Sequence, residues 1–172
     1  MIVINNFIGG KNTPSETKNF IKLYKPTTGE EYAKVPVSTE IEFNQTIQSM
    51  KLAQLEWAET SLTKRSSILF KFKYLIEKNF DELATIISNE HGKVFSDAKG
   101  SLQRGLEVVD FACGIPHLLK GSHSINVGTN VDSFDIRQPL GISAGITPFN
   151  FPAMVPMWMF PMSIACGNAF IL

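Results

Sequence analysis

Residues 141–172 read GISAGITPFNFPAMVPMWMFPMSIACGNAFIL and carry the clearest architectural signal in the 172-residue chain. Residues 141–146 are small and apolar, as in a fully buried parallel strand. The apolar segment 152–165 is expected to be a helix, and Gly167-Asn168 ends it before a second apolar strand begins at Ala169. The pattern therefore predicts a βαβ unit and places the chain in the α/β class.

Charge is distributed unevenly along the chain. All 16 basic and 16 acidic residues lie at or before Arg137, and the net charge is zero. A zero balance argues against a nucleic-acid-binding surface, which would be basic. The charge-free end is long enough to span a membrane, but prolines interrupt it and no basic anchor follows it, so we expect a buried core segment. Two cysteines make no disulfide framework and no leader precedes the first strand, which favours a cytoplasmic location.

Three other segments are expected to be extended. Gly9-Gly10 predicts a turn between two short strands near the N-terminus. Residues 32–37 have the character of a strand, and Pro36, which lacks an amide donor, should confine this strand to the edge of a sheet. Within residues 121–137 apolar and polar residues alternate on both sides of a polar turn, which predicts a hairpin with one polar face.

Four helices are expected between the strand at residues 32–37 and the hairpin at residues 121–137. Thr39 and Glu42 have the spacing of a capping box at the start of the first. Lys64 and Arg65 are placed among the basic residues that surround the second. The apolar stripes expected to face the core are Phe43, Ile47, Met50 and Trp57; Ile68, Leu69, Phe72, Leu75 and Ile76; Phe80, Leu83 and Ile87; and Leu102, Leu106, Val109 and Cys113.

Several patterns that suggest chemistry are interpreted as structural. Residues 141–145 match G-x-S-x-G, but a strand is predicted there rather than the turn of a nucleophile elbow, and no His, Asp or Glu follows Asp135. Cys113 and Cys166 lie in apolar stretches and are expected to be packing residues. No G-x-G-x-x-G loop occurs, and no metal-ligand spacing links the histidines, which are His91, His117 and His123.

The segment Thr147-Pro148-Phe149-Asn150-Phe151-Pro152 carries the remaining signal. Its two prolines fix an extended backbone just beyond the predicted strand, where α/β sheets bind ligands. The Asn150 amide then has two interpretations. It is either a donor that stabilises an oxyanion in acyl-transfer chemistry, or a polar cap of the helix that begins near Pro152. The residues alone leave both open.

Residues 146–152 resemble the strand-to-loop motif of the aldehyde dehydrogenase superfamily, and the resemblance covers nearly the whole chain. The run at 149–161, FNFPAMVPMWMFP, is similar to the CoA-acylating methylmalonate-semialdehyde dehydrogenase branch. The resemblance implies the N-terminal part of that fold: a helical segment, an oligomerisation hairpin and the start of an open parallel NAD-binding sheet. Other matching positions are Lys25 to Glu30, Trp57, Lys64-Arg65, Glu82-Leu83-Ala84, Glu90-His91-Gly92-Lys93, Gly105-Leu106-Glu107 and Gly167-Asn168.

The resemblance also implies a function. Members of the branch oxidise methylmalonate or malonate semialdehyde with NAD, and CoA takes up the acyl group to give propionyl-CoA or acetyl-CoA, in valine and pyrimidine catabolism. Asn150 corresponds to the oxyanion donor, and Thr147, Pro148 and Phe149 to positions that contact NAD; no metal is implied. The nucleophilic Cys and the general-base Glu of the family have no counterpart here, so this chain alone is expected to be inactive.

By the same resemblance, residues 1–120 form the N-terminal strands and helices of the NAD-binding domain. Residues 121–138 form part of the hairpin, and 139–172 the first βαβ of the NAD-binding sheet, cut short. A lone strand pair with one apolar helix leaves a sheet face uncovered, which also suggests an incomplete unit.

For partners we expect a small aldehyde substrate and a homo-oligomer, a tetramer in the family, with neither nucleic acid nor membrane. Three alternatives stay open. The chain could be a fragment of a non-acylating aldehyde dehydrogenase, in which water replaces CoA. It could also be a membrane-attached module or a non-catalytic assembly module.

Overall fold

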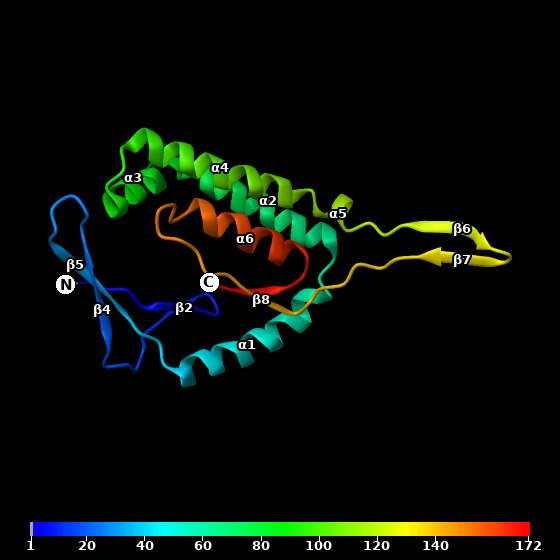
Figure 1. Cartoon of the computed structure of the whole chain (residues 1–172), viewed down its shortest axis with the longest axis horizontal. Helices are drawn as coiled ribbons and strands as arrows, with labels where there is room; N and C mark the ends of the chain where they lie inside the picture. Colours follow the sequence, from blue (N-terminus) through cyan, green and yellow to red (C-terminus); the bar gives the residue numbers. More distant parts are fainter. Residues whose placement is uncertain (1) are drawn as a thin grey trace.

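The βαβ unit expected from the sequence is present in the computed structural model, which describes residues 2–172. Strands β8 (Ile142–Ala144) and β9 (Ala169–Ile171) are parallel, and helix α6 (Met154–Ala165) connects them (Figure 1). The helix begins at Met154 rather than at Pro152. The prediction of a fully buried strand is wrong, because Ala144 is exposed and Ile146, just beyond it, is 100% exposed. Within the described residues, β8 has β9 as its only paired strand.

Helix α1 (Glu40–Ala58) covers the face of β8 and β9 opposite α6 (Figure 1). The indole Nε1 of Trp57 donates to the carbonyl of Ile164 over 2.8 Å, and Gln54 Nε2 donates to the carbonyl of Gly167 over 3.2 Å. These bonds fasten α1 to the turn between α6 and β9. The expectation of an uncovered sheet face is therefore wrong, because a helix about a hundred residues earlier in the chain supplies the cover.

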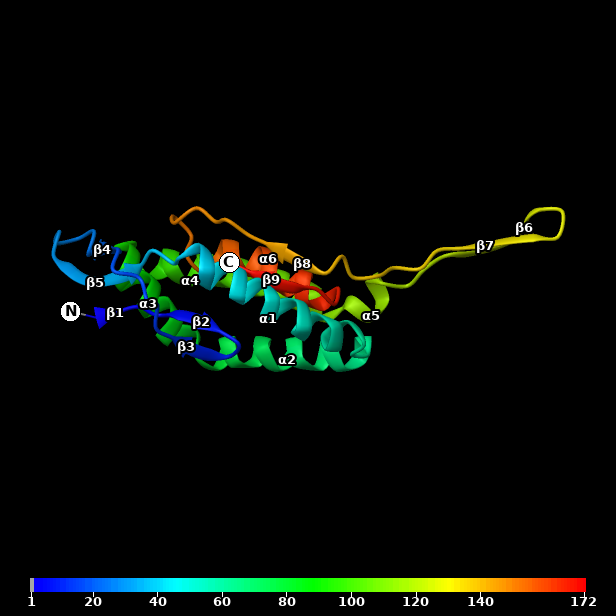
Figure 2. The same cartoon turned by 90° about the horizontal axis from the view of Figure 1, so that it is seen from below.

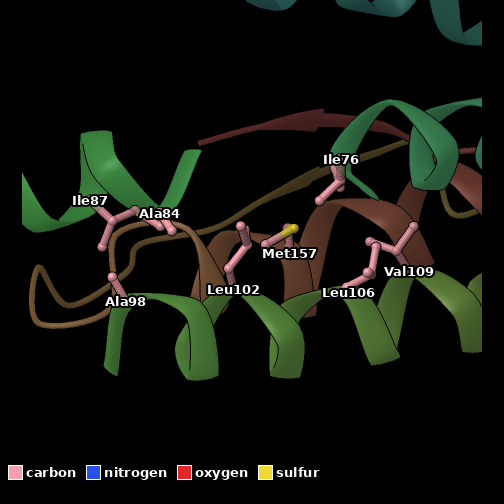
Figure 3. Close-up of a cluster of buried hydrophobic side chains, with 8 residues drawn as sticks. All are labelled: Ile76, Ala84, Ile87, Ala98, Leu102, Leu106, Val109 and Met157. Atoms are coloured by element: carbon pink, nitrogen blue, oxygen red, sulfur yellow. The ribbon is translucent and has the colours of Figure 1, made fainter. Parts of the chain in front are cut away.

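Helices α2 (Leu62–Lys78) and α4 (Phe95–Cys113) pack with α6, α3 (Phe80–His91) packs on α4 and α2, and the single turn α5 (Ile115–Leu118) follows α4 (Figures 1 and 2). All four residues predicted for the core face of α4 are buried. Apolar side chains from four helices converge in the main core (Figure 3): Ile76, Ala84, Ile87, Ala98, Leu102, Leu106, Val109 and Met157. Burial of these side chains is the main term that stabilises the fold.

The capping box predicted at Thr39 and Glu42 is confirmed. Thr39 Oγ1 accepts from the Glu42 amide over 3.2 Å, and the Glu42 carboxylate accepts from the Thr39 amide over 2.7 Å. Hydrogen bonds to the carboxylate, chiefly that of the Thr39 amide, lower the pKa of Glu42 from 4.5 to about 2. The apolar stripe of α1 is less buried than expected, and Phe43 is 51% exposed, because the helix packs on only two short strands.

The buried face of α2 differs from the predicted stripe. Leu69 and Ile76 are buried, but Ile68 and Leu75 are each 44% exposed. Arg65, which the sequence places among exposed basic residues, is buried instead. The inward face of α2 meets α4 and α6, and backbone carbonyls at the ends of these helices accept hydrogen bonds from the polar residues on it.

A separate small sheet has the order β1 (Ile2–Val3), β5 (Glu31–Pro36) and β4 (Phe20–Tyr24), beside the hairpin of β2 (Asn6–Ile8) and β3 (Lys11–Thr13) that turns at Gly9-Gly10. The expected edge position of the strand that contains Pro36 is wrong, since β5 is central. Strand β1 pairs only as far as Lys34, and the Val37 amide bonds to Asn19 beside β4. The missing amide of Pro36 therefore faces the side that β1 does not reach.

The predicted hairpin is also confirmed. Strands β6 (His123–Gly128) and β7 (Val131–Phe134) project away from the helices, as both views show (Figures 1 and 2). The pairing shifts register between Ser124 and Gly128, and Asn126 has a φ of 53°. This irregularity breaks the simple alternation, and every residue of both strands is exposed, so the hairpin has no buried face.

Candidate active site

The loop that contains the predicted site residues leaves the carboxyl end of β8 and leads into α6. Thr147 is half-buried, whereas Pro148 and Asn150 are exposed and Phe149 is 91% exposed. The structure thus brings the predicted site residues together at the strand end where open α/β sheets bind ligands. Their side chains reach solvent and are accessible to a ligand.

A glycine permits the chain to leave β8 close to α6. A Cβ added at Gly145 would lie 2.6 Å from Met159 Cε and 2.6 Å from Phe170 Cζ. A larger residue at this position would require the ends of the Met159 and Phe170 side chains to move, so glycine permits their close packing over the end of β8. The close approach sets where the loop begins.

Asn150 does not cap α6. The N-cap position of that helix is Ala153, and no side-chain cap hydrogen bond is made there. Within residues 2–172, the side chain of Asn150 makes no hydrogen bond, although its backbone carbonyl accepts one from Lys93 Nζ over 3.1 Å. Of the two interpretations open from the sequence, the helix cap is excluded, and the side-chain amide is free to bind a ligand.

Lys93 is the residue near the site that the sequence did not indicate. Its Nζ also lies 4.4 Å from the centroid of the Phe151 ring, a cation–π contact. Lys93 and Asn150 are 57 positions apart, and no spacing pattern joins them. From sequence, Glu90-His91-Gly92-Lys93 was a run that matches the family and, by its residues, a helix end, with no link to the loop. Gly92 confirms the helix end with a φ of +82° at the C-cap of α3.

The structure supports rejection of the nucleophile elbow. Ser143 lies within β8, and its hydroxyl hydrogen-bonds to the Ser163 hydroxyl and donates to the carbonyl of Ala169. A nucleophile elbow would hold the serine on a turn with its oxygen exposed. Ser143 instead joins β8 to α6 and β9.

Neither cysteine is an activated nucleophile. Cys113 is buried in a cluster around Leu69 and Ile115, and burial raises the pKa of its thiol. Burial likewise raises the pKa of the Cys166 thiol, although Arg65 nearby acts in the opposite direction. Both therefore stay protonated at neutral pH, and a thiol is a far weaker nucleophile than a thiolate.

Other features of residues 2–172 add no second centre to the loop. No group of three His, Cys, Asp or Glu side chains is placed to hold a metal ion. In the same range, none of the helices combines the length and apolarity needed to cross a membrane. A cavity of about 290 Å³ between α2 and α4, with Lys73 and Asp110 in its wall, is lined by no residue of the loop.

Comparison with known proteins gives a consistent result. The model of the aldehyde dehydrogenase family matches residues 13–172. The acylating, mitochondrial methylmalonate-semialdehyde dehydrogenase of Arabidopsis thaliana is 46% identical over 169 residues, which is 98% of this chain and 28% of that protein. Malonate-semialdehyde dehydrogenase 1 of Geobacillus kaustophilus is 44% identical over 170 residues, covering 99% of this chain and 35% of that protein.

Solved structures agree. The methylmalonate-semialdehyde dehydrogenase of Oceanimonas doudoroffii superposes with a TM-score of 0.95 at 45% identity, covering 99% of this chain and 35% of that one. A Sinorhizobium meliloti structure, provisionally assigned the same activity and determined in complex with NAD, has a TM-score of 0.95 at 44% identity and the same coverage. The chain thus spans about a third of the length of these relatives.

Proposed function

Because this chain belongs to the aldehyde dehydrogenase family, we propose that its protein oxidises methylmalonate or malonate semialdehyde with NAD and CoA. The products are propionyl-CoA or acetyl-CoA, formed with loss of the carboxylate as CO₂. Relatives that carry these substrate names are 44–46% identical to the chain over nearly all of its length, and one structural relative was determined with NAD.

One observation carries the role of Asn150. Its side-chain amide lies exposed at the carboxyl end of β8 and, within residues 2–172, is engaged by no hydrogen bond. When a nucleophile adds to an aldehyde, negative charge develops on the former carbonyl oxygen. An amide N–H held in place stabilises that oxygen without further reorganisation. In this proposal Asn150 is the side-chain donor of the oxyanion hole.

Thr147, Pro148 and Phe149 fit a contact surface for NAD. The half-buried hydroxyl of Thr147 supplies a polar group, and the exposed ring faces of Pro148 and Phe149 supply apolar surface for a flat heterocycle. They lie at the strand end that nucleotide cofactors use in parallel sheets. The bound NAD would serve as acceptor of the hydride from the substrate carbon.

The two thiols described above do not supply the nucleophile, so the 172-residue polypeptide by itself should not form the covalent adduct. In this proposal, residues 1–120 and 139–172 belong to the NAD-binding domain. Residues 121–138 belong to a hairpin through which copies associate, and the assembly is a tetramer. Two free cysteines suit a cytoplasmic location, where thiols stay reduced.

The first experiment tests the activity and the Asn150 donor together. The protein is purified at its natural length, its intact mass is measured, and NADH formation is followed with malonate semialdehyde, NAD and CoA. We expect CoA-dependent NADH formation, and in Asn150→Ala a kcat lower by roughly 10²- to 10³-fold with nearly unchanged NAD binding. Asn44→Ala, which removes an exposed asparagine on α1, is the control and should retain full activity.

Three results would each contradict a part of the proposal. An intact mass near 19.1 kDa together with no NADH formation would show that the family relationship is one of ancestry only. An active protein in which Asn150→Ala keeps its kcat within about twofold would remove Asn150 from the oxyanion hole. Formation of free acid in place of acyl-CoA would instead identify water as the acyl acceptor and overturn the CoA assignment.

A further inference from the structure

The ammonium group of Lys93 makes two contacts, and both are with the loop that carries Asn150. Its Nζ donates to the backbone carbonyl of Asn150 over 3.1 Å and lies 4.4 Å from the centroid of the Phe151 ring. We propose that Lys93 is a positioning residue that orients the Asn150 amide toward the oxyanion. The inference rests on the function proposed above for Asn150, and it assigns to Lys93 no contact with substrate or cofactor.

The loop itself leaves the orientation of Asn150 undetermined. Pro148 fixes its own φ, and Pro152 restricts the residue before it, Phe151. Between them, Phe149 is 91% exposed and the Asn150 side chain has no hydrogen bond within residues 2–172. Helix α6 makes no side-chain cap bond, and its backbone holds the loop only one residue further on, where the Val155 amide donates to the carbonyl of Phe151 over 3.3 Å. The torsion angles of Asn150 therefore need a restraint from outside the loop.

Lys93 supplies that restraint through the backbone carbonyl oxygen of Asn150. The carbonyl oxygen of Asn150 belongs to the peptide unit that joins it to Phe151, so a hydrogen bond there fixes the ψ angle of Asn150. The ammonium group also lies over the Phe151 ring, so it restrains the side chain of the next residue along the chain. Together the two contacts restrict the backbone from which the Asn150 side chain projects.

The backbone of Lys93 is anchored to the rigid part of the molecule. Its carbonyl accepts from the Ser88 hydroxyl over 2.7 Å, inside the last turn of α3. The preceding residue, Gly92, ends α3 in the left-handed conformation, and a Cβ added there would lie 3.2 Å from Thr27 Cγ2. Ala84 and Ile87 fix α3 in the main core. The two contacts of Lys93 with the loop, called the Lys93 clamp below, thus tie the loop to the helical core.

Backbone order parameters from NMR relaxation test these contacts without any use of activity. In Lys93→Met, which keeps the approximate length of the side chain and removes its charge, the order parameters of the Asn150 and Phe151 amides should fall below about 0.6, while those of α6 stay unchanged. Lys99→Met is the matched control, because Lys99 also lies over aromatic rings, those of Phe80 and Phe95, and does not contact the loop. Equal order parameters at Asn150 and Phe151 in the wild type and Lys93→Met would overturn the proposal.

Kinetics then test whether the Lys93 clamp acts through Asn150. In the active protein, Lys93→Met should lower kcat roughly tenfold with KM values for aldehyde and NAD nearly unchanged, because a misplaced donor costs transition-state stabilisation. In an Asn150→Ala background the same change should have no further effect on kcat. Lys93→Arg, which can donate and stack, should restore kcat to within about threefold of the wild type.

A wild type without activity counts against the proposed function, whereas the order parameters of Asn150 and Phe151 still decide on the contacts of Lys93. A raised KM for NAD in Lys93→Met with unchanged kcat would overturn the positioning role, because Lys93 would then contact the cofactor. A full additional loss in the double variant would overturn it as well, since Lys93 would act independently of Asn150.

Discussion

Arg65 shows how one residue can hold the ends of two helices. It is 6% exposed, and its guanidinium donates to the carbonyls of Thr60, Ala165 and Ala58 over 2.8, 2.9 and 3.4 Å. Ala58 and Ala165 are the last residues of α1 and α6, so a positive charge lies where two helix dipoles are negative. Desolvation lowers the pKa of Arg65 below its ordinary value, and the carbonyl contacts offset part of this cost.

Loss of this group should destabilise the protein without any direct effect on the loop at 147–152. In Arg65→Met the three carbonyls lose a charged donor in a buried place, and the free energy of unfolding should fall by about 2–3 kcal/mol. Urea unfolding measures the change. Lys64→Met removes an exposed charge from the same turn and should lie within about 0.5 kcal/mol of the wild type. Equal urea midpoints for Arg65→Met and Lys64→Met would show that water hydrates the three carbonyls once Arg65 is replaced.

At the scale of elements, the most extensive helix contact is that of α4 with α6, and it depends on a glycine. A Cβ at Gly105 would lie 2.4 Å from Met157 Cε and 3.2 Å from the Cα of Met154. The Met157 methyl group could swing aside, but the backbone of Met154 could not without a shift of the helix. The sequence had presented Gly105 only as part of a matching motif. Its physical reason is the closeness of two helix backbones.

Alanine at two glycines of α4 should therefore have opposite effects. Gly105→Ala should destabilise by about 1–2 kcal/mol, because overpacking exceeds the gain in helix propensity. Gly100→Ala, in the same helix with nothing within 4 Å of the added Cβ, should stabilise by about 0.5–1 kcal/mol. Thermal unfolding of both variants provides the comparison. A stabilised Gly105→Ala would mean that α4 and α6 separate at no cost.

At the scale of the whole molecule, the hairpin of β6 and β7 extends beyond the helical body and buries none of its own residues (Figure 1). Its apolar side chains are largely exposed: Ile125 is 70% exposed and Phe134 is 70% exposed, with Val127, Val131 and Ile136 close to them in sequence. Such a cluster of exposed apolar side chains is unusual on a surface that contacts only water. Association of copies through the hairpin, as proposed above, would cover it.

A double substitution should weaken that association. In Ile125→Ser with Phe134→Ser, two of the largest exposed apolar side chains become polar. The assembled species should therefore dissociate at a higher protein concentration than in the wild type. Light scattering coupled to gel filtration measures the molar mass. Ser124→Ala with Ser133→Ala changes a directly opposed pair on the same hairpin and should leave the mass unchanged. An unchanged mass in the serine variant would place the interface elsewhere.

The loop residues illustrate what could be predicted for the site. The position of Thr147 to Asn150 beyond a strand end was predictable, because two prolines and a preceding apolar strand mark that end locally, while the roles of these residues stay proposals. Whether Asn150 caps α6 was not predictable, since the answer depends on the residue at which the helix begins, and Met154 rather than Pro152 is that residue. Lys93 was out of reach, because a contact across 57 positions leaves no period or spacing in the chain.

Most of the elements and their order follow from the sequence alone, because turns, caps and hydrophobic periods act over a few residues; β4 and the single turn α5 were not predicted. Thus the capping box, the βαβ unit and the hairpin at 121–137 were all correctly predicted. Only the tertiary structure decided that α1 covers the second face of the small sheet, that β5 is central and that Arg65 is buried. Each of these depends on which distant backbone approaches, and that is set by packing of the whole chain rather than by local propensity.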